Sequence, residues 1–164
     1  DEVNFDEATW TIPKERMKAG RHHNVYLSQQ ALDILVAFKT CFGASSYLHP
    51  GRYETTLPIS AATLNRVIDV TVELIRDQGE DFEPFTVHDL RRTASTLLHE
   101  AGFNSDWIEK CLAHEQRGVR AVYNKAEYAE QRRTMMQSWA DMLDEWIRNG
   151  GKVVPIRRQA TALA

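Results

Sequence analysis

Apolar residues recur every three or four positions over most of this chain, and this spacing predicts amphipathic helices. Serines begin the first two helices, and Asn104 or Ser105 begins the fourth, because short polar side chains accept hydrogen bonds from first-turn amides. Gly102 follows the third helix, where the chain commonly needs a left-handed residue. The expected helices cover about 28–40, 60–77, 88–101, 105–113 and 127–149.

The positions expected to face inward share helical spacing within each segment. They are Leu32, Leu35 and Phe38; Leu64, Val67, Ile68, Thr71, Leu74 and Ile75; Leu90, Ala94, Leu97, Leu98 and Ala101; Trp107, Ile108, Cys111 and Leu112; and Tyr128, Met135, Trp139, Met142, Leu143, Trp146 and Ile147.

Three short runs near the N-terminus, 3–5, 9–13 and 23–27, are typical of strands. The last two flank a basic turn that contains a glycine, and this arrangement predicts an antiparallel hairpin. The expected fold is therefore mainly α, with a small antiparallel β-sheet near the N-terminus. We expect one domain over residues 1–149 and a C-terminal tail over 150–164.

Composition favours an ordinary globular domain without a strongly basic surface. The 164 residues are 43% hydrophobic and 26% charged, with a net charge of −3 and a sequence pI near 6.1. No apolar run approaches the length that spans a membrane. Cys41 and Cys111 are isolated, and such thiols are typical of a reducing cytosol. The expected location is cytoplasmic.

Basic residues nevertheless concentrate in two places. The segment 14–21 holds four basic residues and one acid, and the segment 109–133 holds six basic residues and four acids. Acidic residues gather instead at 1–7 and 77–83. This distribution allows a basic face with acidic edges, which is the footprint that nucleic acids require.

A set of chemically active side chains stands out between positions 88 and 123. His88 and Arg91 are three residues apart, so both project from one side of a helix. His114 and Tyr123 follow, and this set has no obvious carboxylate partner. Arginine binds phosphate oxygens through a planar fork, and histidine donates or shuttles protons near neutral pH. A phosphodiester substrate would supply the missing negative charge.

Tyrosine can act as the nucleophile of a covalent step on such a substrate. A free phenol has a pKa of about 10, so forming the phenolate at neutral pH costs roughly 4 kcal/mol. Cationic donors near Tyr123 would offset this cost and would also stabilise charge that builds on the phosphate.

The order H-x-x-R, then L-A-H, then a tyrosine nine residues later resembles the catalytic core of the tyrosine recombinases, the phage-integrase family. HDLRRT and VRAVYNKAEYAEQRR resemble the prophage- and island-type members. The resemblance runs from Trp10 to about Trp146. It implies cleavage and rejoining of DNA strands in site-specific recombination, through a 3′-phosphotyrosine and without a metal or organic cofactor. It also implies a bacterial or phage origin and double-stranded DNA as partner.

The resemblance also implies roles for individual residues. Tyr123 would be the nucleophile, and Arg91, His88 and His114 would bind the phosphate. The stretch WTIPKERMK resembles the family's catalytic hairpin, and this maps the lysine that protonates the leaving oxygen to Lys18. Three residues remain as rivals: Lys14 and Arg16 for the lysine role, and Tyr128 for the nucleophile.

Purely structural roles remain open for each residue taken singly. His88 can cap a helix, Arg91 and Arg92 can be solvated surface charges, and Tyr123 can lie at the edge of the core. The adjacent His22 and His23 have no third ligand at zinc-type spacing, which indicates strand residues beside a turn.

Two other classes of protein compete with the recombinase interpretation. Helices 88–101 and 105–113, joined by a short turn with a glycine, are also typical of a helix-turn-helix DNA-binding module. That interpretation leaves Lys18, His114 and Tyr123 without a role. A type IB topoisomerase shares the proposed chemistry, but the short segment before LAH fits the integrases better.

The chain departs from the family pattern in one respect. The family has a further catalytic arginine on a helix before the first strand, whereas the first arginine here is Arg16, in the hairpin. The family's N-terminal DNA-clamping domain is also unmatched. We therefore expect an N-terminally truncated catalytic domain that is inactive or nearly so by itself. Family members often pass a C-terminal segment between protomers, so we expect self-association on DNA through residues 150–164.

Overall fold

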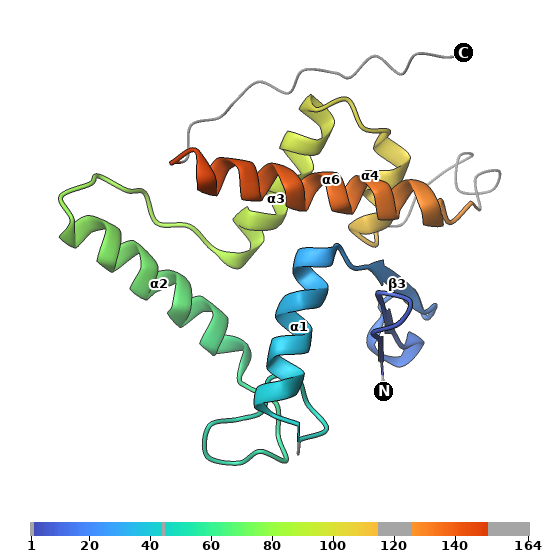
Figure 1. Cartoon of the computed structure of the whole chain (residues 1–164), viewed down its shortest axis with the longest axis horizontal. Coiled ribbons are helices and arrows are strands. Elements are labelled where there is room, and N and C mark those ends of the chain that lie inside the picture. The colour runs from blue at the N-terminus through green and yellow to red at the C-terminus, as the bar shows by residue number, and fades with distance from the viewer. Residues whose placement is uncertain (1, 44, 115–125, 151–164) are drawn as a thin grey trace.

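A small sheet followed by helices makes up the described part of the chain, in a computed structural model that describes residues 2–43, 45–114 and 126–150 (Figure 1). The expected fold class, mainly helical with a small antiparallel sheet, is confirmed. The elements are β1 (Val3–Asn4), β2 (Thr9–Ile12), the 3-10 helix η1 (Lys14–Arg16), β3 (His23–Tyr26), α1 (Gln29–Cys41), α2 (Ala61–Asp77), α3 (Val87–Glu100), α4 (Ser105–Cys111) and α6 (Ala129–Arg148).

The sheet is antiparallel throughout, in the order β1-β2-β3. In its register Thr9 lies opposite Tyr26 and Ile12 lies opposite His23. The three expected strands are thus confirmed, each slightly shorter than predicted. Between β2 and β3 the chain forms η1 and then turns at Gly20, whose φ of 61° suits a residue without a side chain.

Capping side chains begin the helices largely as expected. Ser28 Oγ accepts a hydrogen bond from the amide of Ala31 at 3.3 Å, and Ser60 caps α2 in a similar way. At α4 the cap is Asn104, whose side chain accepts from the Asp106 amide at 2.8 Å. Gly102 follows α3 with a φ of 81°, which confirms the predicted left-handed turn.

The core lies where α6 crosses α3 and α4 (Figure 1). Leu98 of α3, Ile108 of α4, and Met135 and Met142 of α6 form its buried centre. Partly buried residues pack around them: Phe103, Trp107, Cys111, Leu112, Trp139 and Trp146. None of the helices in the described ranges is both long enough and apolar enough to cross a membrane.

The predicted apolar stripe of α2 is only partly correct. Ile68 and Val72 are buried, but Leu64, Val67 and Leu74 are each more than half exposed. Figure 1 shows α2 set to the side of the molecule, away from α6, and its described contacts are chiefly with α3. The apolar surface of α2 is therefore wider than the surface that α3 covers.

The other helices carry smaller errors of the same kind. Leu90 in α3 is 55% exposed, and two expected core positions of α6, Leu143 and Ile147, are exposed. In α1 the predicted inward residues are half-buried. Periodicity identified the apolar side of each helix. How much of that side is buried depends on which other elements pack against it, and the spacing of residues along the chain does not reveal this.

Candidate functional site

Thr86, and not His88, caps α3. The Thr86 hydroxyl accepts a hydrogen bond from the Asp89 amide at 3.3 Å, and the Asp89 carboxylate accepts one from the Thr86 amide at 3.0 Å. This reciprocal capping box satisfies two free amides of the first turn. The Thr86 hydroxyl also donates to the Asp89 carboxylate at 2.8 Å, and this bond and the bond from the Thr86 amide hold the pKa of Asp89 below its usual value, with a smaller contribution from Arg92. His88 is therefore not needed to cap the helix.

His88 and Arg91 lie along the rim of one open cavity between α2 and α3. The α2 side of the cavity is formed by Asn65, Ile68 and Asp69. Both candidate side chains are exposed, and their shared cavity agrees with the prediction that they project from one side of a helix. Arg92 points elsewhere and pairs with Asp89 at 3.0 Å.

Arg91 also connects α3 to the end of α4. Its Nη2 donates a hydrogen bond to the backbone carbonyl of Leu112, the residue that ends α4. Leu112 lies two positions before His114, so this bond brings the guanidinium to the chain that carries the second histidine. Arg91 thereby satisfies one of the carbonyls that a helix end leaves without a partner.

His114 follows a tight turn. Ala113 has a φ of 53°, a left-handed conformation that costs about 1 kcal/mol or more in a residue with a side chain. The His114 amide donates to the Glu109 carbonyl at 3.0 Å, and Nδ1 of His114 lies 2.8 Å from Oε2 of Glu109. The expectation that this set lacks a carboxylate partner was therefore wrong at His114. Glu109 therefore orients the imidazole of His114.

Lys18 lies on the exposed turn between η1 and β3. Among the described residues it makes no hydrogen bond or ion pair with His88, Arg91 or His114. The rival Arg16 is engaged elsewhere, because it pairs with the Glu2 carboxylate, which also accepts a hydrogen bond from Trp10 Nε1 at 3.0 Å. That engagement leaves Lys18 the better placed of the two for contact with a ligand.

Tyr123 lies outside the described residues. Its rival Tyr128 is half-buried and sits immediately before α6 with a φ of 51°. The Tyr128 carbonyl accepts a hydrogen bond from the Arg132 amide at 2.8 Å, so its backbone is part of the first turn of α6.

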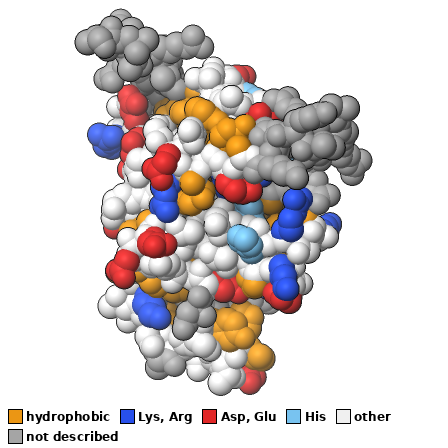
Figure 2. Space-filling view, turned by 90° about the vertical axis from the view of Figure 1, so that its right-hand side faces the viewer, with side chains coloured by type: hydrophobic (Ala, Val, Ile, Leu, Met, Phe, Trp, Pro, Cys, Tyr) orange, Lys and Arg blue, Asp and Glu red, His pale blue; other side chains and the backbone are white. Residues whose placement is uncertain are grey.

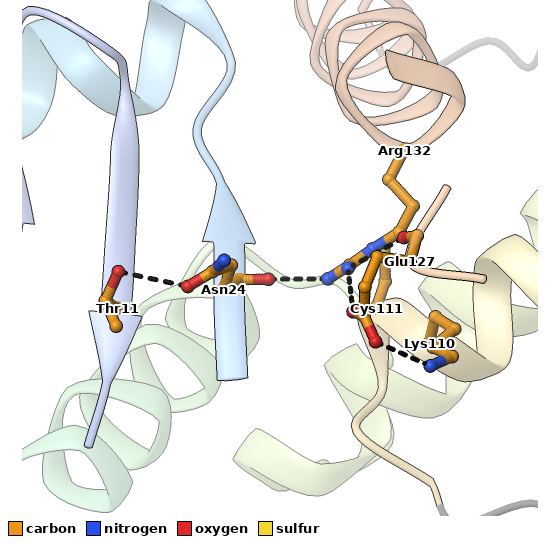
Figure 3. A network of polar contacts seen from close by, with 6 residues as sticks. All are labelled: Thr11, Asn24, Lys110, Cys111, Glu127 and Arg132. Carbon is orange, nitrogen blue, oxygen red and sulfur yellow. Dashed lines mark hydrogen bonds and ion pairs between the residues drawn. The ribbon is translucent and has the colours of Figure 1, made fainter. Parts of the chain in front are cut away.

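A buried arginine that the sequence analysis counted only as local charge lies beside these segments (Figure 3). The Arg132 side chain is 1% exposed and donates to the Asn24 carbonyl at 2.5 Å, to the Cys111 sulfur at 3.5 Å and to the Glu127 carbonyl at 3.3 Å. Its guanidinium also lies over the Tyr26 ring at 4.8 Å. The signal in the sequence was its position on the apolar stripe of α6, three residues before Met135.

Glu127 bridges two cations in the same cluster. Its Oε1 lies 3.0 Å from Lys110 Nζ on α4, and its Oε2 lies 3.7 Å from Arg132 Nη1 on α6. Figure 3 shows this carboxylate between the two basic side chains. Thr11 of β2 extends the network by donating to the Asn24 side chain at 3.0 Å. Hydrogen bonds and ion pairs thus connect the hairpin, α4 and α6.

His23 faces this cluster from β3. Burial lowers the pKa of its imidazole, and the neighbouring Arg132 guanidinium lowers it further. Its Nε2 atom is buried and has no hydrogen-bond partner within the described part of the chain. Burial and the nearby guanidinium therefore both favour the neutral form of His23 over the charged form.

Charges of both signs are interspersed over the face shown in Figure 2, with a histidine between them. The basic face with acidic edges that the sequence allowed is not seen among the described side chains of this view. Opposite charges also lie close together within the described residues, because Lys110 pairs with Glu127 and Arg133 lies 4.0 Å from Glu130.

Known proteins are similar to this chain in sequence. Residues 1–130 match the phage integrase family. The chain is 40% identical to prophage integrase IntZ of Escherichia coli K12 over 151 residues, which is 91% of this chain and 35% of that protein. It is 39% identical to prophage integrase IntA of the same strain over 144 residues, 87% of this chain and 33% of the relative.

A phage protein is also similar. The chain is 35% identical to the integrase of Enterobacteria phage P4 over 160 residues, which is 88% of this chain and 35% of that protein. The chain thus spans about a third of the length of the curated relatives it matches. No solved structure matches it.

Proposed function

This chain belongs to the phage integrase family, and from that premise we propose that the protein cuts and rejoins DNA in site-specific recombination. Double-stranded DNA is the partner, and integration or excision of a mobile element is the outcome. One observation carries the proposal: His88 and Arg91 share a cavity, and Arg91 is bonded to the residue two positions before His114. Three cationic or protonatable donors therefore come from segments that lie together.

We propose that Tyr123 attacks the scissile phosphorus. The Tyr123–phosphorus bond forms as the bond to the 5′ oxygen breaks, and the product is a 3′-phosphotyrosine. His88 takes the phenol proton, and Lys18 gives a proton to the departing 5′ oxygen. Arg91 and His114 donate hydrogen bonds to the non-bridging oxygens, where charge accumulates. The phosphotyrosine conserves the bond, so the 5′ hydroxyl of another strand reverses the step without an external energy source.

The helix-turn-helix alternative receives less support from the composition of α4. This helix has only seven residues, and Ile108, Trp107 and Cys111 are used in the core. The polar side chains on its other side include two half-buried carboxylates, Asp106 and Glu109, and Glu109 is already engaged by His114 at 2.8 Å. A recognition helix needs donors on that side.

We further propose that these 164 residues alone form little or no adduct, because no position in them matches the family's additional arginine. Loss of one such donor typically lowers a rate roughly 10²–10³-fold. We also retain self-association on DNA through residues 150–164, of which 151–164 lie outside the described residues. Sedimentation of the complete gene product on its DNA, with and without 150–164, tests this second point.

The experiment for the central proposal is covalent trapping. Duplexes that the Tyr123→Phe variant binds are selected from a random-sequence pool, nicked near the centre, and incubated with the complete gene product. We expect an adduct that survives boiling in detergent with the unmodified protein and with Tyr128→Phe. Tyr123→Phe should bind the same duplexes and form no adduct. An adduct with Tyr123→Phe, or none with the unmodified protein, contradicts the proposal.

A further inference from the structure

The burial of Arg132 is difficult to explain by stability alone. A guanidinium that leaves water loses its hydration, and a buried ion pair seldom stabilises a protein more than a well-packed apolar residue of similar size. Its position on the α6 stripe, beside the fully buried Met135, is one that an apolar side chain would fill. The burial of the charged Arg132 side chain at this position is better explained if it holds the neighbouring segments in a fixed orientation.

The partners of Arg132 come from three different segments. They are the Asn24 carbonyl on β3, the Cys111 sulfur at the end of α4, and the Glu127 carbonyl before α6. Every donor direction of a planar guanidinium is fixed relative to the others, so these three contacts also fix the segments relative to one another. β3 belongs to the hairpin that carries Lys18, and Cys111 lies three residues before His114.

Lys110 fixes Glu127 from the opposite side. Its side chain is 24% exposed, whereas that of Glu127 is 68% exposed, so the carboxylate is the solvated member of the pair. Position 110 precedes His114 by four residues, and position 127 follows Tyr123 by four residues. The Lys110–Glu127 contact therefore joins the chain just before one proposed catalytic residue to the chain just after another.

We propose that Lys110, Glu127 and Arg132 form a clamp that positions Tyr123 for attack, and that all three are positioning residues of the proposed reaction. The clamp holds position 127 against α4 and β3, which limits where a nucleophile four residues away can lie. This inference rests on the proposed function. It adds that the rate of strand cleavage depends on side chains that contact neither DNA nor the phosphate.

The test is single-turnover adduct formation at saturating nicked duplex, using the complete gene product and the selected duplexes described above. Glu127→Ala and Lys110→Met should each slow adduct formation by about 10-fold, as expected for the loss of a hydrogen bond between charged groups. The dissociation constant for intact duplex should change by less than about twofold, because the clamp does not touch DNA. The double variant should be no slower than Glu127→Ala alone, since Glu127→Ala already removes the contact that Lys110→Met removes.

Glu130→Ala is the matched control. Glu130 is an exposed acid on the first turn of α6 that pairs only with the neighbouring Arg133 among the described residues, and it does not reach α4. The Glu130→Ala variant should form the adduct at the same rate as the unmodified protein. Thermal unfolding of all variants separates positioning from stability, and Glu127→Ala should keep the melting temperature of Glu130→Ala.

The outcomes separate the clamp from the function on which it rests. If the unmodified protein forms an adduct and Glu127→Ala forms it as fast as Glu130→Ala, the clamp is overturned while the recombinase proposal stands. Additive losses in the double variant, or a loss of duplex binding that accounts for the slower rate, also overturn the clamp. If the unmodified protein forms no adduct on any selected duplex, the proposed function fails and the clamp fails with it.

Discussion

The guanidinium of Arg91 donates a hydrogen bond to the backbone carbonyl of Leu112, which ends α4 two residues before His114. This contact joins α3 to α4, and Arg91 also lines, together with His88, the cavity between α2 and α3. The same guanidinium is the proposed ligand of the scissile phosphate, so Arg91 has a structural partner before DNA arrives. A phosphate has to compete with, or share, a donor that already holds α4.

Replacement of Arg91 tests this dual role. Arg91→Ala should slow adduct formation by roughly 10²–10³-fold, because one donor to the charge on the phosphate is lost. Arg91→Lys should recover little of the rate, since a lysine lacks the planar fork. Arg92→Ala is the control, and its rate should change by less than about fivefold because it removes only an exposed ion pair with Asp89. Similar losses at both positions would contradict a specific role for Arg91.

At the start of α3, the residue that caps the helix differs from the residue proposed for catalysis, so substitutions at the two positions should have different effects. Thr86→Ala removes the capping box and should lower the free energy of unfolding by about 1 kcal/mol. His88→Ala should change that free energy by less than about 0.5 kcal/mol, because the side chain is exposed and does not cap the helix. The rate of adduct formation should instead fall more in His88→Ala than in Thr86→Ala. Urea denaturation and trapping of the two variants measure both quantities, and a destabilised His88→Ala would argue for a structural role.

His23 predicts a dependence of stability on pH. Its folded-state pKa is lowered from 6.5 by burial and by Arg132, so the unfolded chain binds its proton more readily. The free energy of unfolding should therefore fall as the pH drops through 6.5 towards the lowered value. Between about pH 7.5 and pH 5.5, His23→Gln should show a shallower decline in urea denaturation. His22→Gln changes an exposed neighbour and should follow the unmodified protein, whereas parallel slopes for all three proteins would refute the assignment to His23.

Local rules predicted the elements of this fold well. Alternation and turn residues located the three strands, and Ser28, Ser60 and Gly102 marked helix ends at the correct positions. The reason is physical, because a cap or a turn depends on residues a few positions apart. The spacing of His88 and Arg91 likewise placed both on one side of α3.

Features that depend on distant segments were predicted less well. The exposed stripe of α2, the carboxylate beside His114 and the burial of Arg132 each depend on how separate elements pack. The position of Arg132 on an apolar stripe was visible in the sequence, but its partners Asn24 and Cys111 were not. Such contacts arise only when β3, α4 and α6 come together.

The most direct test of the account is the identity of the residue that becomes attached to DNA. Adduct formed by the complete gene product on a nicked, selected duplex is digested with protease and nuclease, and the nucleotide-linked peptide is sequenced by mass spectrometry. The account predicts a phosphodiester link between the 3′ end of the cleaved strand and the phenolic oxygen of Tyr123. A link at Tyr128 or at any other residue, or a linkage to the 5′ end, would contradict it.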